Sequence, residues 1–180
     1  QQVSIIVTPI SLAFCFLCGV FVPIQYMPDG IVYIARFLPI YWFETVNDLL
    51  AKHADIHLKL KPGTNVAFAN GMMNVIINEG LADEEFIRTR TEGFEELKEI
   101  VKEYTPEKVA EICHIDPDHL REAALMYAKA KKAPIIYCLG VTEHSTGTEG
   151  VMSMSNMAML VGKLGKSGCG VNPLRGQNNV

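Results

Sequence analysis

Apolar residues follow two different patterns along the chain. Residues 3–22 form a run of twenty residues without a charge, VSIIVTPISLAFCFLCGVFV. At about 1.5 Å per helical residue this run matches the roughly 30 Å hydrocarbon core of a bilayer, which predicts a transmembrane helix. Pro9 would kink that helix in its second turn. One alternative is a shorter helix that begins at Pro9 with Thr8 as its cap. The other is a signal peptide, which the absence of a basic n-region and of a cleavage site disfavours.

Residues 24–50 carry features of a membrane interface. Pro28-Asp29-Gly30 interrupts the chain. The segment also contains aromatic side chains of the kind enriched at membrane–water interfaces, namely Tyr26, Tyr33, Tyr41 and Trp42. We therefore predict a short interfacial helix after the transmembrane-type segment.

From residue 54 onward the pattern is that of a globular protein. Residues 56–60 alternate between apolar and polar side chains before Pro62-Gly63, which predicts a short strand that ends in a turn. Thr64 or Asn65 is expected to cap a helix whose apolar side chains recur at helical spacing. The backbone amides at this helix start suit a phosphate, although capping alone explains these residues equally well.

Further helices are predicted from apolar spacing and from capping residues. Thr105-Pro106 and Asp116-Pro117 each place a capping side chain before a proline at the first helical position. Charged residues fill the faces opposite the apolar stripes, as expected for helices that cover a core. These predicted helices span residues 83–89, 94–104, 107–112 and 118–131.

The run from residue 133 to 141 predicts the central element of the fold. It is largely apolar and lies between polar segments, which is typical of a strand buried on both faces of a parallel sheet. A polar loop at 142–150 and a Met-rich helix at 151–162 follow, and α/β proteins bind ligands beyond the carboxyl ends of such strands. The methionines are expected to fill the core. The fold class predicted is α/β, a partial doubly wound parallel sheet with flanking helices, preceded by the transmembrane-type helix and the interfacial helix.

Residues 162–180 contain five glycines and predict a loop that is held against another part of the protein. Its polar chemistry is concentrated in Arg175, Gln177, Asn178 and Asn179. A guanidinium can form a forked pair of hydrogen bonds with a carboxylate or phosphate, and amides can bind the edge of a heterocycle. An ordinary surface loop accounts for the composition equally well.

Composition narrows the possible functions. The 180 residues allow one domain or two small ones. Sixteen Lys and Arg against 20 Asp and Glu give a net charge of −4, which provides no general electrostatic reason to bind nucleic acid. The five cysteines are odd in number and scattered, unlike a disulfide framework, and this favours a reducing compartment. Cys15 and Cys18 have ligand-like spacing but no second pair nearby.

Residues 53–180 resemble the catalytic alpha subunit of molybdenum or tungsten formate dehydrogenases, in the bis-molybdopterin guanine dinucleotide oxidoreductase superfamily. The similarity is carried by ADIHLKLKPGTNVAFANGMMNVIINEGL, GVTEHSTGT, NMAMLVGKLGK and, most specifically, GVNPLRGQNNV. It implies oxidation of formate to CO2, or the reverse, with bis-molybdopterin guanine dinucleotide and Mo or W as the cofactor. Two electrons would leave through a 4Fe-4S cluster toward an electron-transfer subunit.

The resemblance also implies roles for individual residues. Arg175 falls on the Arg that contacts formate beside the metal, and Gln177 lines the same pocket. The cofactor contacts fall on three short segments. These are Pro62, Gly63, Thr64 and Asn65 in the P-G-T-N turn, Gly140, Val141, Thr142 and Glu143 at the strand end, and Gly176 and Asn178 beside Arg175.

The chain departs from this family's pattern in several places. Glu143 stands where Gln is frequent, Ser167 replaces a usual Pro, and Cys169 replaces a small hydroxyl residue. The cysteine motif for the iron–sulfur cluster and the metal-ligating Cys or selenocysteine, followed by His, have no counterpart here. Cys113-His114 imitates that dyad but lies between two predicted helices, so we do not assign it to the metal. We therefore expect the chain to be inactive without the rest of the alpha subunit.

Residues 1–50 resemble a different family, the C-terminal part of ABC-2 type transporter permeases. The similar segment is GVFVPIQYMPDGIVYIARFLPIYWFETVND. In that family such segments help form the substrate path, and no Walker motif for ATP hydrolysis occurs in this chain. A permease membrane segment without enzymatic activity is therefore the alternative function.

Two domains are predicted, a permease-like segment at 1–50 and a partial oxidoreductase domain at 51–180. No linker rich in Gly, Ser or Pro joins them, which leads us to expect a spliced sequence rather than a natural fusion. The lack of an initiator Met and the end within R-G-Q-N-N also lead us to expect a fragment. The dehydrogenase part is expected in the cytoplasm, with membrane attachment through residues 1–50 if that segment is genuine.

Overall fold

The computed structural model describes residues 26–37, 45–46 and 49–174, and the chain divides into two compact units, residues 1–57 and residues 58–180. The first unit contains helix α2 (Asp29–Ala35), which begins directly after Pro28. Tyr33 and Phe37 form an edge-to-face pair with ring centroids 5.7 Å apart. The predicted short helix in 24–50 is therefore present, and its position at a membrane interface stays a prediction.

The predicted transmembrane segment, residues 3–22, lies outside the described residues. Within the part of the chain that is described, no helix has both the length and the apolar character needed to cross a bilayer.

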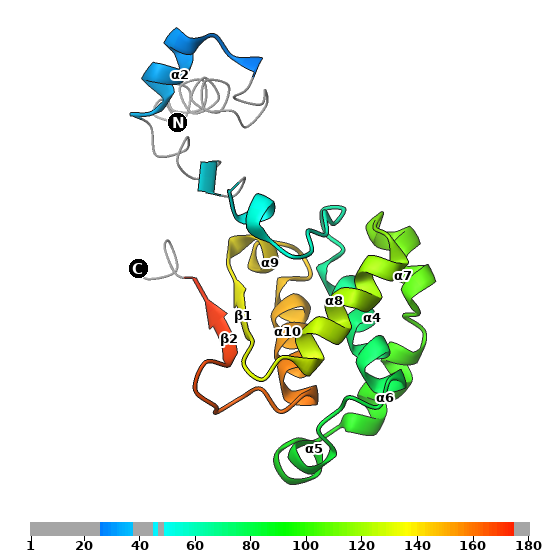
Figure 1. The fold of residues 1–180 in the computed structure, drawn as a ribbon. Coiled ribbons are helices and arrows are strands. Elements are labelled where there is room, and N and C mark those ends of the chain that lie inside the picture. The colour runs from blue at the N-terminus through cyan, green and yellow to red at the C-terminus, as the bar shows by residue number, and fades with distance from the viewer. Residues whose placement is uncertain (1–25, 38–44, 47–48, 175–180) are drawn as a thin grey trace, which may run out of the picture. The chain divides into compact units, whose positions relative to one another are not determined.

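The second unit consists mainly of helices with a small sheet at one side (Figure 1). Five helices precede the first strand, and two helices separate it from the second. In chain order the elements are α4 (Asn65–Asn78), α5 (Glu84–Arg90), α6 (Phe94–Lys102), α7 (Pro106–Cys113), α8 (Pro117–Lys129), β1 (Pro134–Tyr137), α9 (Leu139–Thr142), α10 (Gly147–Leu160) and β2 (Gly170–Pro173).

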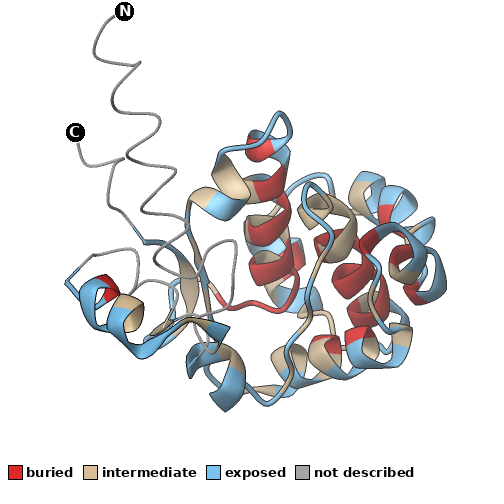
Figure 2. Cartoon of the chain, turned by 90° about the horizontal axis from the view of Figure 1, so that it is seen from above, coloured by how far each residue is buried: buried red, intermediate tan, exposed pale blue. Residues whose placement is uncertain are grey.

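Helix α4 is the centre of the core. It contacts α6, α7, α8 and α10, and every residue from 69 to 76 is buried, so the helix is covered on nearly all sides (Figure 2). Gly71 allows the closest approach, because a Cβ atom there would lie 2.9 Å from Cγ2 of Val109 and 3.2 Å from Cδ2 of Leu120. Met73 and Ile76 on the same helix are completely buried.

The predicted helix starts are confirmed by their caps. Asp83 accepts a hydrogen bond from the Phe86 amide at 2.9 Å and starts α5. Thr105 caps α7, and Asp116 caps α8 by accepting from two backbone amides. Those two N–H donors hold the pKa of the Asp116 carboxyl below its usual value. Each side chain satisfies amides that have no partner within the helix.

The sheet is smaller than the sequence predicts. Strands β1 and β2 are parallel, with register from Pro134 opposite Gly170 to Tyr137 opposite Pro173. The prediction that β1 is buried on both faces is wrong for the described structure, because Ile136 is 59% exposed and burial alternates along the strand. The strand also ends earlier than predicted, since α9 begins at Leu139 and the Val141 amide donates to the carbonyl of Cys138.

Two further predictions of secondary structure are wrong. Residues 56–60 have half-buried apolar side chains and exposed polar ones, as the alternation predicts, but they pair with no strand in the described structure. At the end of this segment, the amide of Lys61 donates to the carbonyl of Cys113, the last residue of α7. The segment predicted to be only a loop, 162–180, contains strand β2. Gly170 and Pro173 interrupt the alternation of apolar and polar residues that would have indicated a strand in the sequence.

Lys163 joins α8 to the chain that follows α10. Its side chain is buried, with 4% of the residue exposed, and its ammonium donates to the carbonyls of Tyr127 and Ala128 at the end of α8. The ammonium also lies 4.4 Å from the centre of the Tyr127 ring. Loss of hydration on burial lowers the pKa of Lys163. A cation at the carboxyl end of a helix satisfies carbonyls that have no partner within it.

Candidate functional site

Two segments that are distant in sequence meet at one edge of the second unit. Asn65, the first residue of α4, donates from Nδ2 to the carbonyl of Gly140 in α9 at 3.3 Å. The P-G-T-N turn at 62–65 therefore lies against the strand-end segment at 140–143. We call these two segments together the Gly140 site.

The turn before α4 has a defined conformation. Gly63 has a left-handed φ of 84°, and the Thr64 amide donates to the carbonyl of Lys61. The Thr64 hydroxyl donates to that same carbonyl at 2.7 Å and does not cap the helix. Thr64 thus occupies the N-cap position, as predicted, but its side chain closes the turn. The amides of the first turn of α4 consequently keep their positive partial charge without a side-chain cap.

The strand-end segment is a short helix that follows β1 directly. Within α9, the Glu143 amide donates to the carbonyl of Leu139 at 2.9 Å. The start of α10 packs tightly against the end of α9. A Cβ atom at Gly147 would lie 2.1 Å from the carbonyl oxygen of Thr142, and one at Gly150 would lie 3.1 Å from Cγ1 of Val141. These two glycines therefore set how closely α10 approaches the segment.

The Gly140 site presents open backbone and one unpaired polar atom. An added Cβ atom would meet nothing within 4 Å at Gly63 or at Gly140. The hydroxyl of Thr142 is buried and has no hydrogen-bond partner among the residues that the structure describes. A site with accessible backbone and an unpaired donor fits a ligand that is rich in hydrogen-bonding groups.

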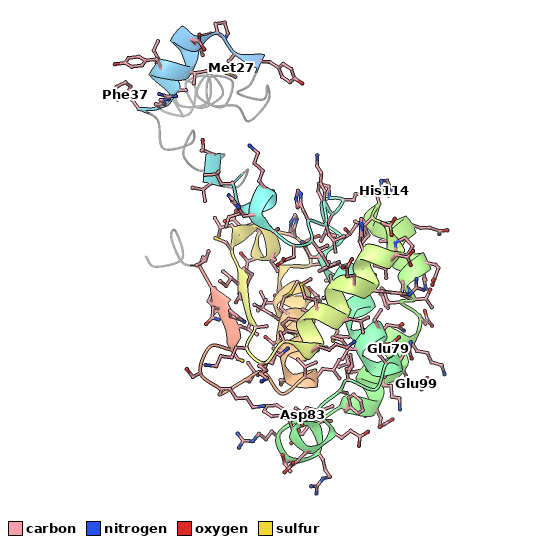
Figure 3. All side chains as sticks on the ribbon, viewed as in Figure 1. Met27, Phe37, Glu79, Asp83, Glu99 and His114 are labelled. Carbon is pink, nitrogen blue, oxygen red and sulfur yellow. The ribbon has the colours of Figure 1, made fainter. Side chains whose placement is uncertain are left out.

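Cys113 is in the core, where it contacts the turn of the Gly140 site, and His114 lies at the end of α7. The Cys113 thiol is buried with Sγ 3.7 Å from the carbonyl of Thr64, and burial raises its pKa. Raising the pKa of a thiol disfavours the thiolate that binds metals. His114 is exposed at the end of α7, with a left-handed φ of 57° (Figure 3). Across the described ranges, no three His, Cys, Asp or Glu side chains gather into a possible metal site.

The residues assigned to the substrate, Arg175 and Gln177, lie outside the described residues, as do Gly176 and Asn178. Leu174, which directly precedes Arg175, is described. The amide of Leu174 donates to the carbonyl of Tyr137 at 2.7 Å, and the thiol of Cys138 donates to the carbonyl of Leu174 at 3.1 Å. Leu174 is therefore held at the carboxyl end of β1, where the strand-end segment begins.

Two side chains at this edge were not predicted as part of the site. Cys138 contacts Leu174, and His144 lies 3.0 Å from the carbonyl of Gly140 through Nε2. His144 is four residues after Gly140, and in helical backbone a side chain leans back toward the preceding turn. That spacing is the only signal in the sequence that indicates the contact.

Comparison with known proteins identifies similar sequences and similar structures. The family model for molybdopterin oxidoreductases matches residues 30–179. The F420-dependent formate dehydrogenase subunit alpha of Methanocaldococcus jannaschii is 55% identical over 132 residues, which are 73% of this chain and 20% of that protein. Formate dehydrogenase H of Escherichia coli is 52% identical over 130 residues, which are 72% of this chain and 18% of that protein.

The acetylene hydratase from Pelobacter acetylenicus has a similar structure, with a TM-score of 0.64 and 39% sequence identity. The similarity covers 66% of this chain and 16% of that one. The chain thus spans about one fifth of the length of the curated relatives described above. The family match begins at residue 30, inside the segment predicted to be permease-like, and the predicted resemblance to ABC-2 permeases is not supported.

Proposed function

Because the chain belongs to the molybdopterin oxidoreductase family, we propose that it is a portion of a formate dehydrogenase catalytic alpha subunit. In this proposal it binds bis-molybdopterin guanine dinucleotide with Mo or W and contributes the arginine that holds formate. The identities above 50% to two formate dehydrogenase subunits support this substrate, whereas the permease alternative has no such support. The 4Fe-4S cluster and the metal-ligating residue would belong to the rest of the subunit.

The Gly140 site fits one pterin guanine dinucleotide. The cofactor carries phosphates and a guanine with several donors and acceptors. The uncapped amides at the start of α4 suit a phosphate, and the hydroxyl of Thr142 supplies a buried group that still lacks a partner. The open surroundings of Gly63 and Gly140 let a ligand approach the backbone closely. In our proposal Pro62 to Asn65 and Gly140 to Glu143 border the dinucleotide, together with Gly176 and Asn178.

Arg175 and Gln177 would act on formate. Formate is a small anion with no side chain, so its orientation depends on charge-assisted hydrogen bonds to its carboxylate. A guanidinium provides two parallel donors for this purpose. The position of Leu174 supports this role, because Leu174 directly precedes Arg175 in the sequence and is held at the carboxyl end of β1, next to the strand-end segment.

The proposed reaction converts formate to CO2, a proton and two electrons. When bound, the metal with its two pterins would accept the two electrons. Arg175 would hold the carboxylate, and Gln177 would line the pocket with its amide. A 4Fe-4S cluster in the rest of the subunit and an electron-transfer subunit would supply the route for those electrons. We expect this dehydrogenase to work in the cytoplasm, as part of a larger assembly.

The observation that carries the proposal is the contact between Asn65 and Gly140, which joins the two segments assigned to the dinucleotide. Formate-dependent dye reduction, measured with reconstituted metal and pterin, tests it. We expect turnover by a full-length subunit that carries this segment and none by the 180-residue chain alone. A full-length subunit that binds no pterin dinucleotide contradicts the proposal, and turnover by the isolated chain contradicts the assignment of the metal ligands to other parts of the subunit.

A further inference from the structure

We propose that His144 is a positioning residue for the bound dinucleotide. Together with Asn65, it holds the carbonyl of Gly140 and so sets the conformation of the strand-end segment. This inference rests on the proposed function, since it concerns the segment assigned there to the cofactor. His144 is not among the residues that the resemblance assigns to the site.

The carbonyl of Gly140 belongs to the end of a very short helix. Helix α9 has four residues, so its last carbonyls lack partners from following helical turns. The carbonyl of Leu139 accepts from the Glu143 amide at 2.9 Å. The next carbonyl, that of Gly140, instead receives two side chains, Nε2 of His144 at 3.0 Å and Nδ2 of Asn65 at 3.3 Å.

These two donors come from different parts of the chain. His144 follows α9 directly, whereas Asn65 is the first residue of α4, the helix at the centre of the core. The shared carbonyl therefore connects the strand-end segment to the helix at the centre of the core. This tie is needed because Gly140 has no side chain to restrict its backbone and no neighbour within 4 Å of a Cβ position. Without it the segment would have to be ordered by the ligand, which weakens binding.

The contact also determines the tautomer of His144. A carbonyl oxygen only accepts hydrogen bonds, so Nε2 must carry the hydrogen. In the neutral imidazole Nδ1 is then an acceptor. An exposed imidazole without a partner exchanges between its two tautomers even though it favours Nε2–H, so exclusive occupancy of the Nε2–H form is what the contact predicts.

The matched variants His144→Gln and His144→Asn test the role in a full-length subunit that carries this segment. A glutamine amide nitrogen can take the place of Nε2, whereas an asparagine amide is too short to reach it. We expect His144→Gln to retain the dinucleotide within about twofold of the wild type. We expect His144→Asn to retain it about two- to tenfold less tightly, the effect of one net hydrogen bond. His119→Ala, at an exposed histidine on α8, is the control and should change nothing.

Three measurements on each variant separate the possible roles. They are the content of guanine dinucleotide, the melting temperature of the unloaded protein, and kcat and KM for formate. Positioning predicts that His144→Asn loses cofactor while the melting temperature stays unchanged, and that His144→Gln rescues the loss. Equal behaviour of both variants and the wild type would overturn the proposal. An equal fall in melting temperature for both variants would show a structural role only.

Nitrogen-15 NMR of the histidines in the unloaded protein separates this inference from the proposed function. We expect His144 to be in the Nε2–H tautomer, and Asn65→Ala to leave that tautomer unchanged. A mixture of tautomers at His144 would contradict the contact itself. A wild-type subunit that carries the Nε2–H tautomer but holds no dinucleotide would instead contradict the proposed function, and with it the role of His144 toward that ligand.

Discussion

The helical core and the Gly140 site are built in opposite ways. Around α4 most of the buried side chains are apolar, Asn70 and Asn74 being the buried polar ones on this helix, and Gly71 lets α7 and α8 approach so closely that no Cβ atom fits without displacement. At the Gly140 site the glycines face open space, and a few directional hydrogen bonds hold the backbone. Packing therefore stabilises one region, while the other keeps polar groups available for a ligand. Substitutions should affect these two properties separately.

The largest expected effect is on stability and comes from the core. Met73 is completely buried in α4. Met73→Ala should therefore lower the free energy of unfolding by about 2–5 kcal/mol, because buried apolar atoms are removed and a cavity is left in their place. Chemical denaturation measures this change. Met152→Ala, at a position that is 58% exposed on α10, is the control and should cost far less. Equal losses for the two variants would show that α4 is not the centre of the core.

The next effect is on chemistry and should leave the core intact. In a full-length subunit, Arg175→Lys keeps the charge but loses the planar fork that holds a carboxylate. We expect formate capture to weaken by about 1.5–3 kcal/mol, roughly a ten- to hundredfold fall in kcat/KM. Metal content and melting temperature should not change.

Arg88→Lys on α5 is the matched control for that variant, because Arg88 is an exposed arginine in the helical part. If Arg175 only holds its loop in place, Arg175→Lys should lose cofactor or thermal stability together with activity. An unchanged kcat/KM would end the assignment of Arg175 to formate.

A smaller effect is expected at the end of α8. Lys163→Met keeps the approximate length of the side chain but removes the donors to the carbonyls of Tyr127 and Ala128. Leaving those carbonyls without partners should lower stability by about 1–2 kcal/mol, because the lost bonds are partly offset by no longer burying an ammonium. Thermal unfolding measures the change, and Lys166→Met, at an exposed lysine of the same loop, is the control. A rise in stability would show that the burial cost of the ammonium exceeds its hydrogen bonds.

The helical core was largely predictable from the sequence because its signals are local. Asp83, Thr105 and Asp116 mark helix starts through the amides of the next residues, and the structure places the helices within one or two residues of the predicted starts. Helix α10 was the exception. It begins at Gly147, four residues before the predicted start. Gly147 and Gly150 are needed there because α9 approaches closely, and the spacing of apolar residues in the sequence does not indicate that contact.

The sheet and the Gly140 site depend on contacts between distant residues. Alternation at 56–60 predicted a strand, but a strand also needs a partner, and this segment has alternating burial without a partner strand among the described residues. Strand β2 was missed because its pairing with β1 is not encoded in its own composition. The bond between Asn65 and Gly140 joins residues 75 positions apart, so only the resemblance to a family had grouped them. Their role toward a cofactor stays a prediction.

The smallest expected effect concerns Tyr127, whose hydroxyl is buried without a hydrogen-bond partner in the described structure. Burial, with a smaller contribution from Cys169, raises the pKa of this hydroxyl to about 12 from a usual value near 10. The folded protein thus keeps a proton that the unfolded chain loses first. Stability from this group is complete below about pH 10 and falls as the pH rises from about 10 to about 12.

Tyr127→Phe should remove that part of the pH dependence. Near pH 7 its stability should equal or exceed that of the wild type by up to about 1 kcal/mol, because an unpaired buried hydroxyl is replaced by hydrogen. Denaturation at a series of pH values from 7 to about 11 measures both effects, with Tyr104→Phe as the control, since the Tyr104 ring is only partly buried at the edge of the core. If Tyr127→Phe is clearly destabilised at pH 7, the hydroxyl has a partner, and the end of α8 is held by polar contacts as the Gly140 site is. If Tyr127→Phe is not destabilised, the end of α8 is held by packing and by the hydrogen bonds of Lys163, without a contribution from the Tyr127 hydroxyl.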